Sequence, residues 1–217
     1  MKFFMRYVYE AEIACLRAHK SGKFQEEPVL EWLKKKNLGG VYVDCGAHVG
    51  NHTLFFAKFC PSKVVVSIEA HPVIFAILQE NMNRNLGSVR SKWAGKGKAA
   101  WFKSGSKVHM GDPPHNNAGH TCVVGKGGTV VETIAVDDID EVAHGKVTVL
   151  KIDVEDVEEQ VIMGAMNTLE RWKPVIIVER HSPGQLKIFH QLIKPFGYVR
   201  TAEWSGIHTF AFECPRS

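Results

Sequence analysis

The chain has 217 residues, of which 45% are hydrophobic and 23% charged, and its formal net charge is +4. This length suits one globular domain and is short for two, while the composition excludes a disordered or fibrous chain. The mild positive charge by itself identifies no partner. The cysteines show no CxxC spacing, so we expect free thiols and no metal site; they are Cys15, Cys45, Cys60, Cys122 and Cys214.

The sequence predicts a cytoplasmic protein without a membrane span. No apolar run approaches the roughly 18 residues that a membrane helix needs. Charged side chains interrupt residues 1–20, which therefore lack the apolar core of a signal peptide. The oligomeric state is left open.

The first forty residues are predicted to form a helical extension packed on the core. Apolar side chains recur at helical spacing from Tyr7 to Leu16, and Pro28 opens a second short helix. Lysines in the last turn of that second helix complement the helix dipole. We assign residues 1–40 to this extension and residues 41–217 to the main domain.

After Val41, short apolar runs alternate with amphipathic stretches. This alternation predicts an α/β fold with a mostly parallel sheet and helices on both faces. Residues 95–128 are the exception, a long polar excursion of the kind that is often functional. The expected strands are 41–43, 64–68, a run near Val89, 100–102, 130–134, 147–152, 175–178, 197–200 and 208–212, and the expected helices are 50–59, 72–83, 155–172 and 185–193.

Two neighbouring strand ends indicate a nucleoside site. The strand from Val41 runs into Asp44 and a glycine turn that ends at Gly50, at the edge where open α/β sheets bind ligands. No Lys-Ser or Lys-Thr follows Gly50, and GxGxxG is absent, so neither a phosphate loop nor a dinucleotide motif is present. The strand 64–68 runs directly into Glu69, and such an acid can accept both hydroxyl groups of a ribose.

The sequence also resembles a known family. Five segments carry the resemblance in family order, namely 44–50, 67–72, 133–138, 150–155 and 174–179. They resemble the FkbM family of methyltransferases from about Val41 to His181. The resemblance implies a Rossmann-like methyltransferase sheet of seven strands that ends in an antiparallel hairpin, with S-adenosylmethionine as cofactor and usually O-methylation. Residues 41–217 would then be the methyltransferase domain.

Carried over residue by residue, the resemblance implies that Asp44, Gly46 and Gly50 line the methionine end of the cofactor and that Glu69 holds the ribose. Trp93 is expected to border the adenine. The full set of expected cofactor-binding residues is Asp44, Gly46, Ala47, His48, Gly50, Asn51, Glu69, Ala70, Trp93 and Asp153.

Two positions depart from the family pattern. The family often has Asn where His48 stands and usually has Gly where Asp156 stands. We expect Asp156 in the first turn of a helix, where a carboxylate is electrostatically favourable. The substrate preference implied by the family is weakened by these departures.

The expected catalytic residues are Asp153, Glu155, Glu179 and His181, which follow two strands at the same sheet edge. Methyl transfer is a displacement, so orientation of the acceptor supplies much of the acceleration and a positioned base adds to it. Adjacent acids can orient a hydroxyl, bind an amine or hold a divalent metal. The same acids can instead merely favour a helix N-terminus. His120 lies in a segment that resembles a polar family segment reaching toward the cofactor.

The acceptor is left between two classes, with a hydroxyl-bearing small molecule or glycan ranked first. A basic stretch with interleaved aromatic side chains favours nucleic acid as the alternative. A non-catalytic nucleoside-binding protein on the same fold is a third possibility. The basic residues are Arg84, Arg90, Lys92, Lys96, Lys98, Lys103 and Lys107, and the aromatic ones are Trp93, Trp101 and Phe102.

Overall fold

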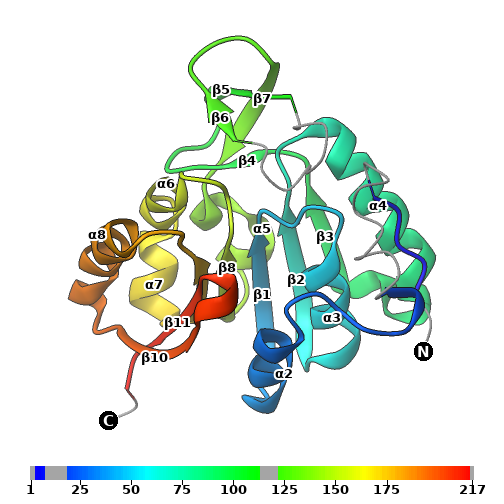
Figure 1. Cartoon of the computed structure of the whole chain (residues 1–217), viewed down its shortest axis with the longest axis horizontal. Helices are drawn as coiled ribbons and strands as arrows, with labels where there is room; N and C mark the ends of the chain where they lie inside the picture. The colour runs from blue at the N-terminus through cyan, green and yellow to red at the C-terminus, as the bar shows by residue number, and fades with distance from the viewer. Residues whose placement is uncertain (1–2, 8–18, 113–121, 216–217) are drawn as a thin grey trace.

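A twisted central sheet organises the chain in a computed structural model that describes residues 3–7, 19–112 and 122–215 (Figure 1). Its strand order is β10-β11-β9-β8-β1-β2-β3, and β11 alone among these described strands runs antiparallel to its neighbours. This sheet confirms the predicted fold class. Its strands are β1 (Gly40–Cys45), β2 (Ser62–Ile68), β3 (Trp93–Lys96), β8 (Val147–Ile152), β9 (Val175–Glu179), β10 (Val199–Trp204) and β11 (Thr209–Glu213).

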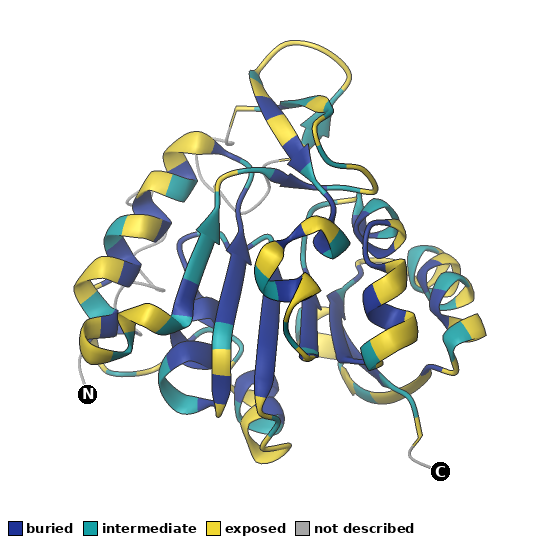
Figure 2. Cartoon of the chain, turned by 180° about the vertical axis from the view of Figure 1, so that it is seen from behind, coloured by how far each residue is buried: buried dark blue, intermediate teal, exposed yellow. Residues whose placement is uncertain are grey.

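Helices cover both faces of this sheet (Figure 2). One face carries α2, α3 and α4, and the other carries α5, α6, α7 and α8. The strands between the two layers are therefore buried on both sides, as their unbroken apolar runs predict. The helices are α2 (Glu27–Lys35), α3 (Asn51–Phe59), α4 (Pro72–Leu86), α5 (Asp140–Ala143), α6 (Glu158–Met163), α7 (Met166–Trp172) and α8 (Pro183–Ile193).

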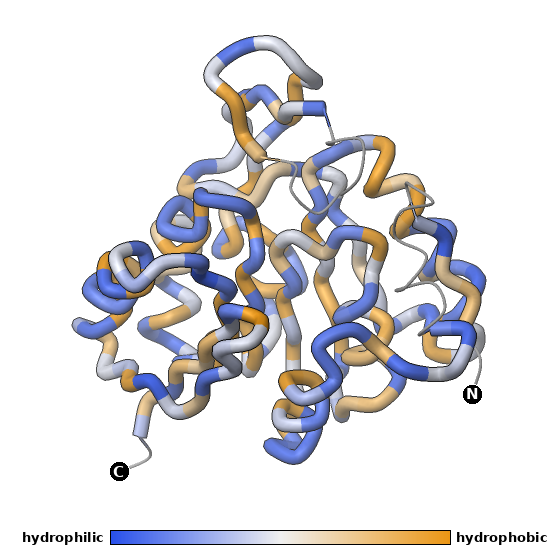
Figure 3. The backbone as a smooth tube through the Cα atoms, in the orientation of Figure 1, coloured by the Kyte–Doolittle hydropathy of each residue, from blue (hydrophilic) through white to orange (hydrophobic). Residues whose placement is uncertain are grey.

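Alternation along β1 shows how one strand serves two cores. Tyr42 packs into the cluster under α2, α3 and α4, whereas Val41 and Val43 pack into the cluster on the opposite face. Successive strand residues point to opposite faces, so both sets are apolar here. Helix α4 instead alternates between hydrophobic and hydrophilic residues along its length, because only one of its sides is buried (Figure 3).

The described part of the N-terminal segment packs against α3. Phe3 lies against Phe24 with ring centroids 5.0 Å apart, and Phe24 lies 5.2 Å from Phe55 of α3. Met5 is buried in the same cluster. Most of the helix expected after Tyr7 lies in residues 8–18, outside the described residues.

Much of the polar excursion forms a second sheet, which stands beyond the carboxyl edge of the central sheet (Figure 1). Its order is β4-β7-β5-β6, and buried Ala99, Met110 and Val131 join it to half-buried Ala70, next to Glu69. Residues 113–121, including His120, lie outside the described residues. The strands are β4 (Ala99–Ala100), β5 (Lys107–Met110), β6 (Val123–Val124) and β7 (Thr129–Ile134).

Two predicted elements are wrong. The strand expected near Val89 is a 3₁₀ helix over Gly87–Lys92, and β3 begins only at Trp93. The helix expected over residues 155–172 is two helices, α6 and α7, with a break at Gly164. A Cβ on Gly164 would lie 2.1 Å from the Trp101 carbonyl oxygen, so this position comes too close to the neighbouring backbone for any other residue.

Candidate functional site

The loop after β1 has the backbone of a ligand-binding turn. Gly46 and Gly50 have φ values of +75° and +98°, and His48 between them has +49°. A Cβ on Gly46 would lie 1.7 Å from the Asp153 carbonyl oxygen, so glycine is required there. Non-glycine residues rarely adopt such a conformation, but Asn and His do so more often than most. His48 is therefore among the residue types that tolerate the backbone of this turn.

Glu69, directly after β2, ties the turn to the start of α4. Its Oε2 accepts the His48 N–H at 2.9 Å and its Oε1 accepts the His71 N–H at 2.9 Å. Burial raises the pKa of Glu69 to about 7, although both of these hydrogen bonds oppose the rise. A carboxylate has about four lone-pair sites, so each oxygen can still accept a hydroxyl proton from a ligand.

A chain of buried hydrogen bonds runs beneath the turn. The Trp93 indole N–H donates to Ser67 Oγ at 3.0 Å, and Ser67 Oγ lies 2.7 Å from Thr53 Oγ1. Thr53 in turn donates to Asp44 Oδ2 at 2.7 Å. The side chains of Asp44 and Trp93, both expected to bind cofactor, thus have partners inside the protein, and Asp44 is fully buried.

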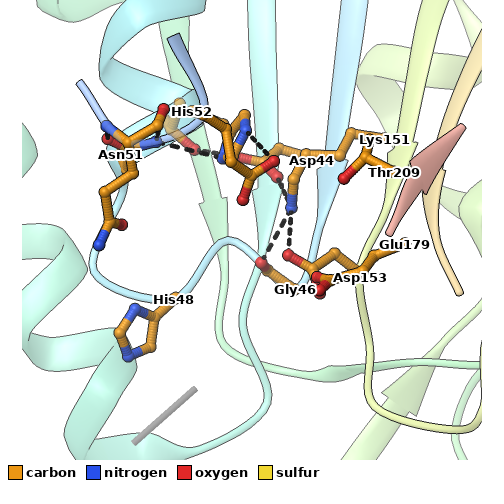
Figure 4. A network of polar contacts seen from close by, with 12 residues as sticks. Asp44, Gly46, His48, Asn51, His52, Lys151, Asp153, Glu179 and Thr209 are labelled. Atoms are coloured by element: carbon orange, nitrogen blue, oxygen red, sulfur yellow. Dashed lines mark hydrogen bonds and ion pairs between the residues drawn. The ribbon is translucent and has the colours of Figure 1, made fainter. Parts of the chain in front are cut away.

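Lys151 of β8 connects this chain to the acids expected to be catalytic (Figure 4). Its Nζ lies 3.3 Å from Asp44 Oδ1, 3.1 Å from Asp153 Oδ2 and 3.4 Å from the Gly46 carbonyl oxygen. Burial lowers the pKa of Lys151, but Asp153, Asp44 and Glu26 raise it by more, so the ammonium group stays charged. A buried cation with this set of partners fixes the spacing of the β1 and β8 ends.

Asp153 and Glu179 end adjacent strands, and their carboxyl groups share a hydrogen bond. Burial and the charge of Asp153 raise the pKa of Glu179 well above its usual range. Burial opposes ionisation of Asp153 too, but Lys151 and the Glu179 hydrogen bond together hold the pKa of Asp153 low. Two carboxyl groups that share a hydrogen bond do not both ionise. Near neutral pH Glu179 therefore carries the proton and Asp153 carries the negative charge.

The other two expected catalytic residues lie at the rim. His181 Nε2 is 3.7 Å from Glu179 Oε1, and the His181 side chain is 51% exposed. Its ring makes an edge contact with His208 at a centroid distance of 5.5 Å. Glu155 has a φ of +41°, in the left-handed region that few such residues adopt.

The expectation for Asp156 is wrong. Asp156 precedes α6, which begins at Glu158, and its φ is +69°. Only glycine enters this region without a steric cost, and Asp is among the residues that tolerate it. The usual family glycine thus has a conformational reason. The Asp156 carboxylate accepts a hydrogen bond from Gln185 Nε2 at 2.8 Å.

Asn51 and Ala70 face away from the turn that they flank. The Asn51 amide binds the Gln25 backbone, with N–H to Oδ1 at 2.9 Å and Nδ2 to carbonyl oxygen at 3.2 Å. Ala70 packs toward the second sheet. Ala47 is buried, and its N–H donates to the Ile68 carbonyl oxygen at 3.0 Å, which anchors the turn to β2.

Four functional candidates were missed from the sequence. Lys151 carried a signal, because it precedes Asp153 by two residues on a strand and shares its face. Glu26 directly precedes α2 and His52 lies in the first turn of α3, with 3.5 Å between Glu26 Oε2 and His52 Nε2. Buried Arg180 pairs with Glu158 and Glu159 and anchors the backbone next to Glu179.

Much of the basic stretch is paired. Lys96 lies 3.0 Å from Glu141, Lys98 lies 2.6 Å from Glu132, and Arg84 pairs with Glu80 at 2.7 Å. Arg90 stacks over the Trp93 ring. Within the described residues Lys92, Lys103 and Lys107 have no ion-pair partner. None of the helices in the described ranges combines the length and apolar character needed to cross a bilayer.

The fold brings the candidate site residues together at one edge of the central sheet. The sheet order places β1 next to β8 at the switch point, and the glycine turn, the strand-end acid and the acidic pair all lie at the carboxyl edge there. The chain belongs to the FkbM methyltransferase family, because residues 44–200 match the family model described as "Methyltransferase FkbM domain".

Solved structures support this assignment at the level of fold. Methyltransferase FkbM from Methylobacillus flagellatus KT aligns over 96% of this chain and 56% of its own, with a TM-score of 0.64 and 17% identity. A precorrin-6y C5,15-methyltransferase from Geobacter metallireducens GS-15 aligns over 89% and 90% of the two chains, with a TM-score of 0.51 and 13% identity. An rRNA methylase from Streptococcus thermophilus aligns over 87% and 96%, with a TM-score of 0.53 and 9% identity.

A curated relative matches a shorter segment. Ribosomal RNA small subunit methyltransferase H from Thermosipho melanesiensis is 41% identical over 54 residues, which are 25% of this chain and 18% of that protein. The chain therefore spans just over half of the FkbM structure, and its match covers under a fifth of the ribosomal RNA methyltransferase.

Proposed function

We propose that this methyltransferase moves a methyl group from S-adenosylmethionine to a hydroxyl group of a small molecule or glycan. The observation that supports it most directly is the glycine turn facing Glu69, with the Asp153–Glu179 pair at the next strand ends. We assign residues 41–217 to catalysis and residues 1–40 to an extension on that domain.

The residues around the turn fit the cofactor. A Cβ on Gly50 would lie 2.5 Å from Met82 Cε, so the backbone here packs closely against α4. Glu69 retains lone pairs for the ribose hydroxyl groups. Gly46, Ala47 and His48 would lie against the methionine end, while their backbone N–H groups stay bonded to Ile68 and Glu69. When bound, S-adenosylmethionine supplies an electrophilic methyl group on a sulfonium.

Asp153 and Glu179 provide the acid–base function in this proposal. Lys151 keeps Asp153 ionised, so Asp153 can accept a hydrogen bond from the acceptor hydroxyl and orient its oxygen. The hydroxyl proton would pass to the Asp153 carboxylate as the oxygen takes the methyl group, and the carbon–sulfur bond would break to leave S-adenosylhomocysteine. Glu155 and His181 line the rim of the same edge, where they would contact the rest of the acceptor.

Nucleic acid is the second candidate acceptor. Lys92, Lys103 and Lys107 have no ion-pair partner in the described part of the chain, and Phe102 nearby in the sequence is 46% exposed, which suits contact with phosphates and bases. The ion pairs of Arg84, Lys96 and Lys98 leave a smaller basic surface than the sequence predicts. We therefore rank the hydroxyl-bearing small molecule or glycan first.

Calorimetry provides the test. We expect binding of S-adenosylhomocysteine and weaker or no binding of ATP and NAD, because no loop is built to hold a pyrophosphate. Tight ATP binding without a response to S-adenosylhomocysteine would overturn the proposal. Transfer of tritiated methyl to a panel of hydroxyl compounds then identifies the acceptor, whereas salt-sensitive RNA binding with methylation of that RNA would favour the second candidate.

A further inference from the structure

The segment before α2 brings a carboxylate to the acceptor side of the site. Two hydrogen bonds between the Gln25 backbone and the Asn51 side chain fasten this segment to the first turn of α3. His19 Nε2 contacts the same Asn51 Oδ1 at 3.0 Å. Glu26 follows directly, outside the residues that match the family model. Its position is set by the contacts of this segment with Asn51.

Glu26 faces a buried imidazole. His52 Nε2 lies 3.5 Å from Glu26 Oε2, which is beyond a good hydrogen bond, and the atom has no hydrogen-bond partner among the described residues. His52 is only 8% exposed, and its ring interacts electrostatically with Asp153. A buried nitrogen without a partner costs free energy, so this ring is suited to a ligand group.

The surroundings of Glu26 are those of the acidic pair. Burial raises the pKa of Glu26, but His52 and Lys151 lower it by more, and the carboxylate also interacts with Asp153. It contributes as well to the raised pKa of Glu179. The side chains of Glu26, Asp153 and Glu179 are each about one-quarter exposed (25%, 28% and 27%), so a ligand can reach all three.

We propose that Glu26 and His52 form the wall of the acceptor site opposite Asp153 and Glu179, and that this wall selects an acceptor with a protonated amine beside its reacting hydroxyl. Three partly exposed carboxyl groups, those of Glu26, Asp153 and Glu179, lie there beside Lys151 and His52, and Glu26 and Asp153 carry the negative charge. These carboxylates would repel a phosphate or a nucleic-acid backbone at this position, whereas they would attract an ammonium group. This inference rests on the proposed function and narrows its acceptor class to amino alcohols and amino sugars.

Sinefungin tests the wall without knowledge of the acceptor. It is an analogue of S-adenosylmethionine that carries an ammonium group where the transferred methyl stands. We expect the wild-type protein to bind sinefungin about tenfold more tightly than S-adenosylhomocysteine, by calorimetry. Glu26→Gln should reduce this preference by about threefold or more and leave the affinity for S-adenosylhomocysteine unchanged. Glu27→Gln, an exposed neighbour in the same helix turn, is the matched control and should change neither affinity.

Each outcome separates the two proposals. Failure to bind S-adenosylhomocysteine would overturn the proposed function itself. Normal binding of S-adenosylhomocysteine, with equal or weaker binding of sinefungin, would overturn the acidic wall alone. An unchanged preference in Glu26→Gln would remove Glu26 from the wall, and unchanged affinity for S-adenosylhomocysteine in that variant shows that it is folded. Should the variant not fold, the wild-type ratio still decides whether the site is acidic.

Discussion

Asp153 and Glu179 end adjacent strands and share one hydrogen bond, yet they differ in charge. The difference comes from Lys151, which lies 3.1 Å from Asp153 Oδ2. The sequence placed both acids at one sheet edge, but it could not show which would hold the proton. The position of the proton depends on the buried charge of Lys151, which Asp44, Asp153 and the Gly46 carbonyl oxygen stabilise.

Asp153→Asn tests whether the Asp153 carboxylate acts in methyl transfer and not in cofactor binding. We expect turnover to fall roughly tenfold or more, equivalent to about 1.4 kcal/mol of transition-state stabilisation, with a much smaller change in affinity for S-adenosylhomocysteine. Asparagine keeps the size and one acceptor oxygen but removes the charge that draws the hydroxyl proton. The comparison is kcat against calorimetric affinity on well-folded protein. Unchanged kcat would retire Asp153 as a catalytic residue and leave Glu179 and His181 as candidates.

Glu69→Ala has two expected effects because Glu69 has two tasks. Affinity for S-adenosylhomocysteine should fall by about 1.5–3 kcal/mol for each ribose hydrogen bond lost, as an upper limit. The free energy of unfolding should fall by about 1–3 kcal/mol, because the N–H groups of His48 and His71 lose their acceptor. Calorimetry and urea unfolding measure the two separately. Normal affinity in folded Glu69→Ala would show that Glu69 only ties the two loops.

At the scale of elements, the central strands could be predicted closely because their apolar runs are long and end in glycines or acids. β8 lies where the pattern placed it, at Val147–Ile152, and β2 begins only slightly earlier than expected. Failures came where long-range contacts decide the backbone. The break between α6 and α7 depends on the approach of Trp101 to Gly164, which no local pattern reports.

The turn after β8 gives a prediction about conformation. Asp156→Val should lower the free energy of unfolding by about 1–2 kcal/mol, because a β-branched residue is strained at a φ of +69°. Asp156→Gly should stay within about 1 kcal/mol of wild type, since relief of backbone strain offsets the lost hydrogen bond to Gln185. Urea unfolding of both variants measures the pair. Equal destabilisation would show that the carboxylate, and not the backbone, is what the turn requires.

Considered as a whole, the molecule contains buried carboxyl groups that bind a proton more tightly when folded. The pKa of Glu69 rises from its ordinary 4.5 to about 7, and that of Glu179 rises further above its usual range. A raised carboxyl pKa contributes stability that is complete below the unfolded pKa and is lost as the pH rises through the folded one. Stability should therefore decline as the pH rises from about 4.5 to about 7 because of Glu69, and it should decline further up to about pH 9 because of Glu179.

Glu179→Gln isolates one part of this decline. The variant cannot ionise at this position, so relative to wild type it should gain about 1 kcal/mol or more in free energy of unfolding as the pH rises from 6 to 9. Urea midpoints at several pH values measure the gain. Glu203→Gln, at an exposed position, is the control and should follow the wild-type curve. Parallel curves for Glu179→Gln and wild type would mean that Glu179 is ionised in the folded protein at pH 6.

The central sheet and its helices could be predicted well from the sequence, whereas the second sheet and the contacts of the segment before α2 could not. Alternating strands and helices define the central sheet, but the short strands β5 and β6 lie in a polar stretch without clear periodicity. The approach of Glu26 to His52 joins segments that share no local signal. Such contacts depend on the tertiary arrangement of segments that are distant in the sequence, and local patterns in a single sequence do not encode this arrangement.

The close approach of Gly46 to Asp153 limits which substitutions the loops after β1 and β8 can accept. The Asp153 N–H donates to the Cys45 carbonyl oxygen at 3.1 Å, and its own carbonyl oxygen leaves no room for a side chain on Gly46. The loop after β1, which we propose to bind the cofactor, and the loop after β8, which carries Asp153, therefore cannot be altered independently. We expect changes of substrate to arise instead in the segment before α2, whose Glu26 interacts with Lys151 and Asp153.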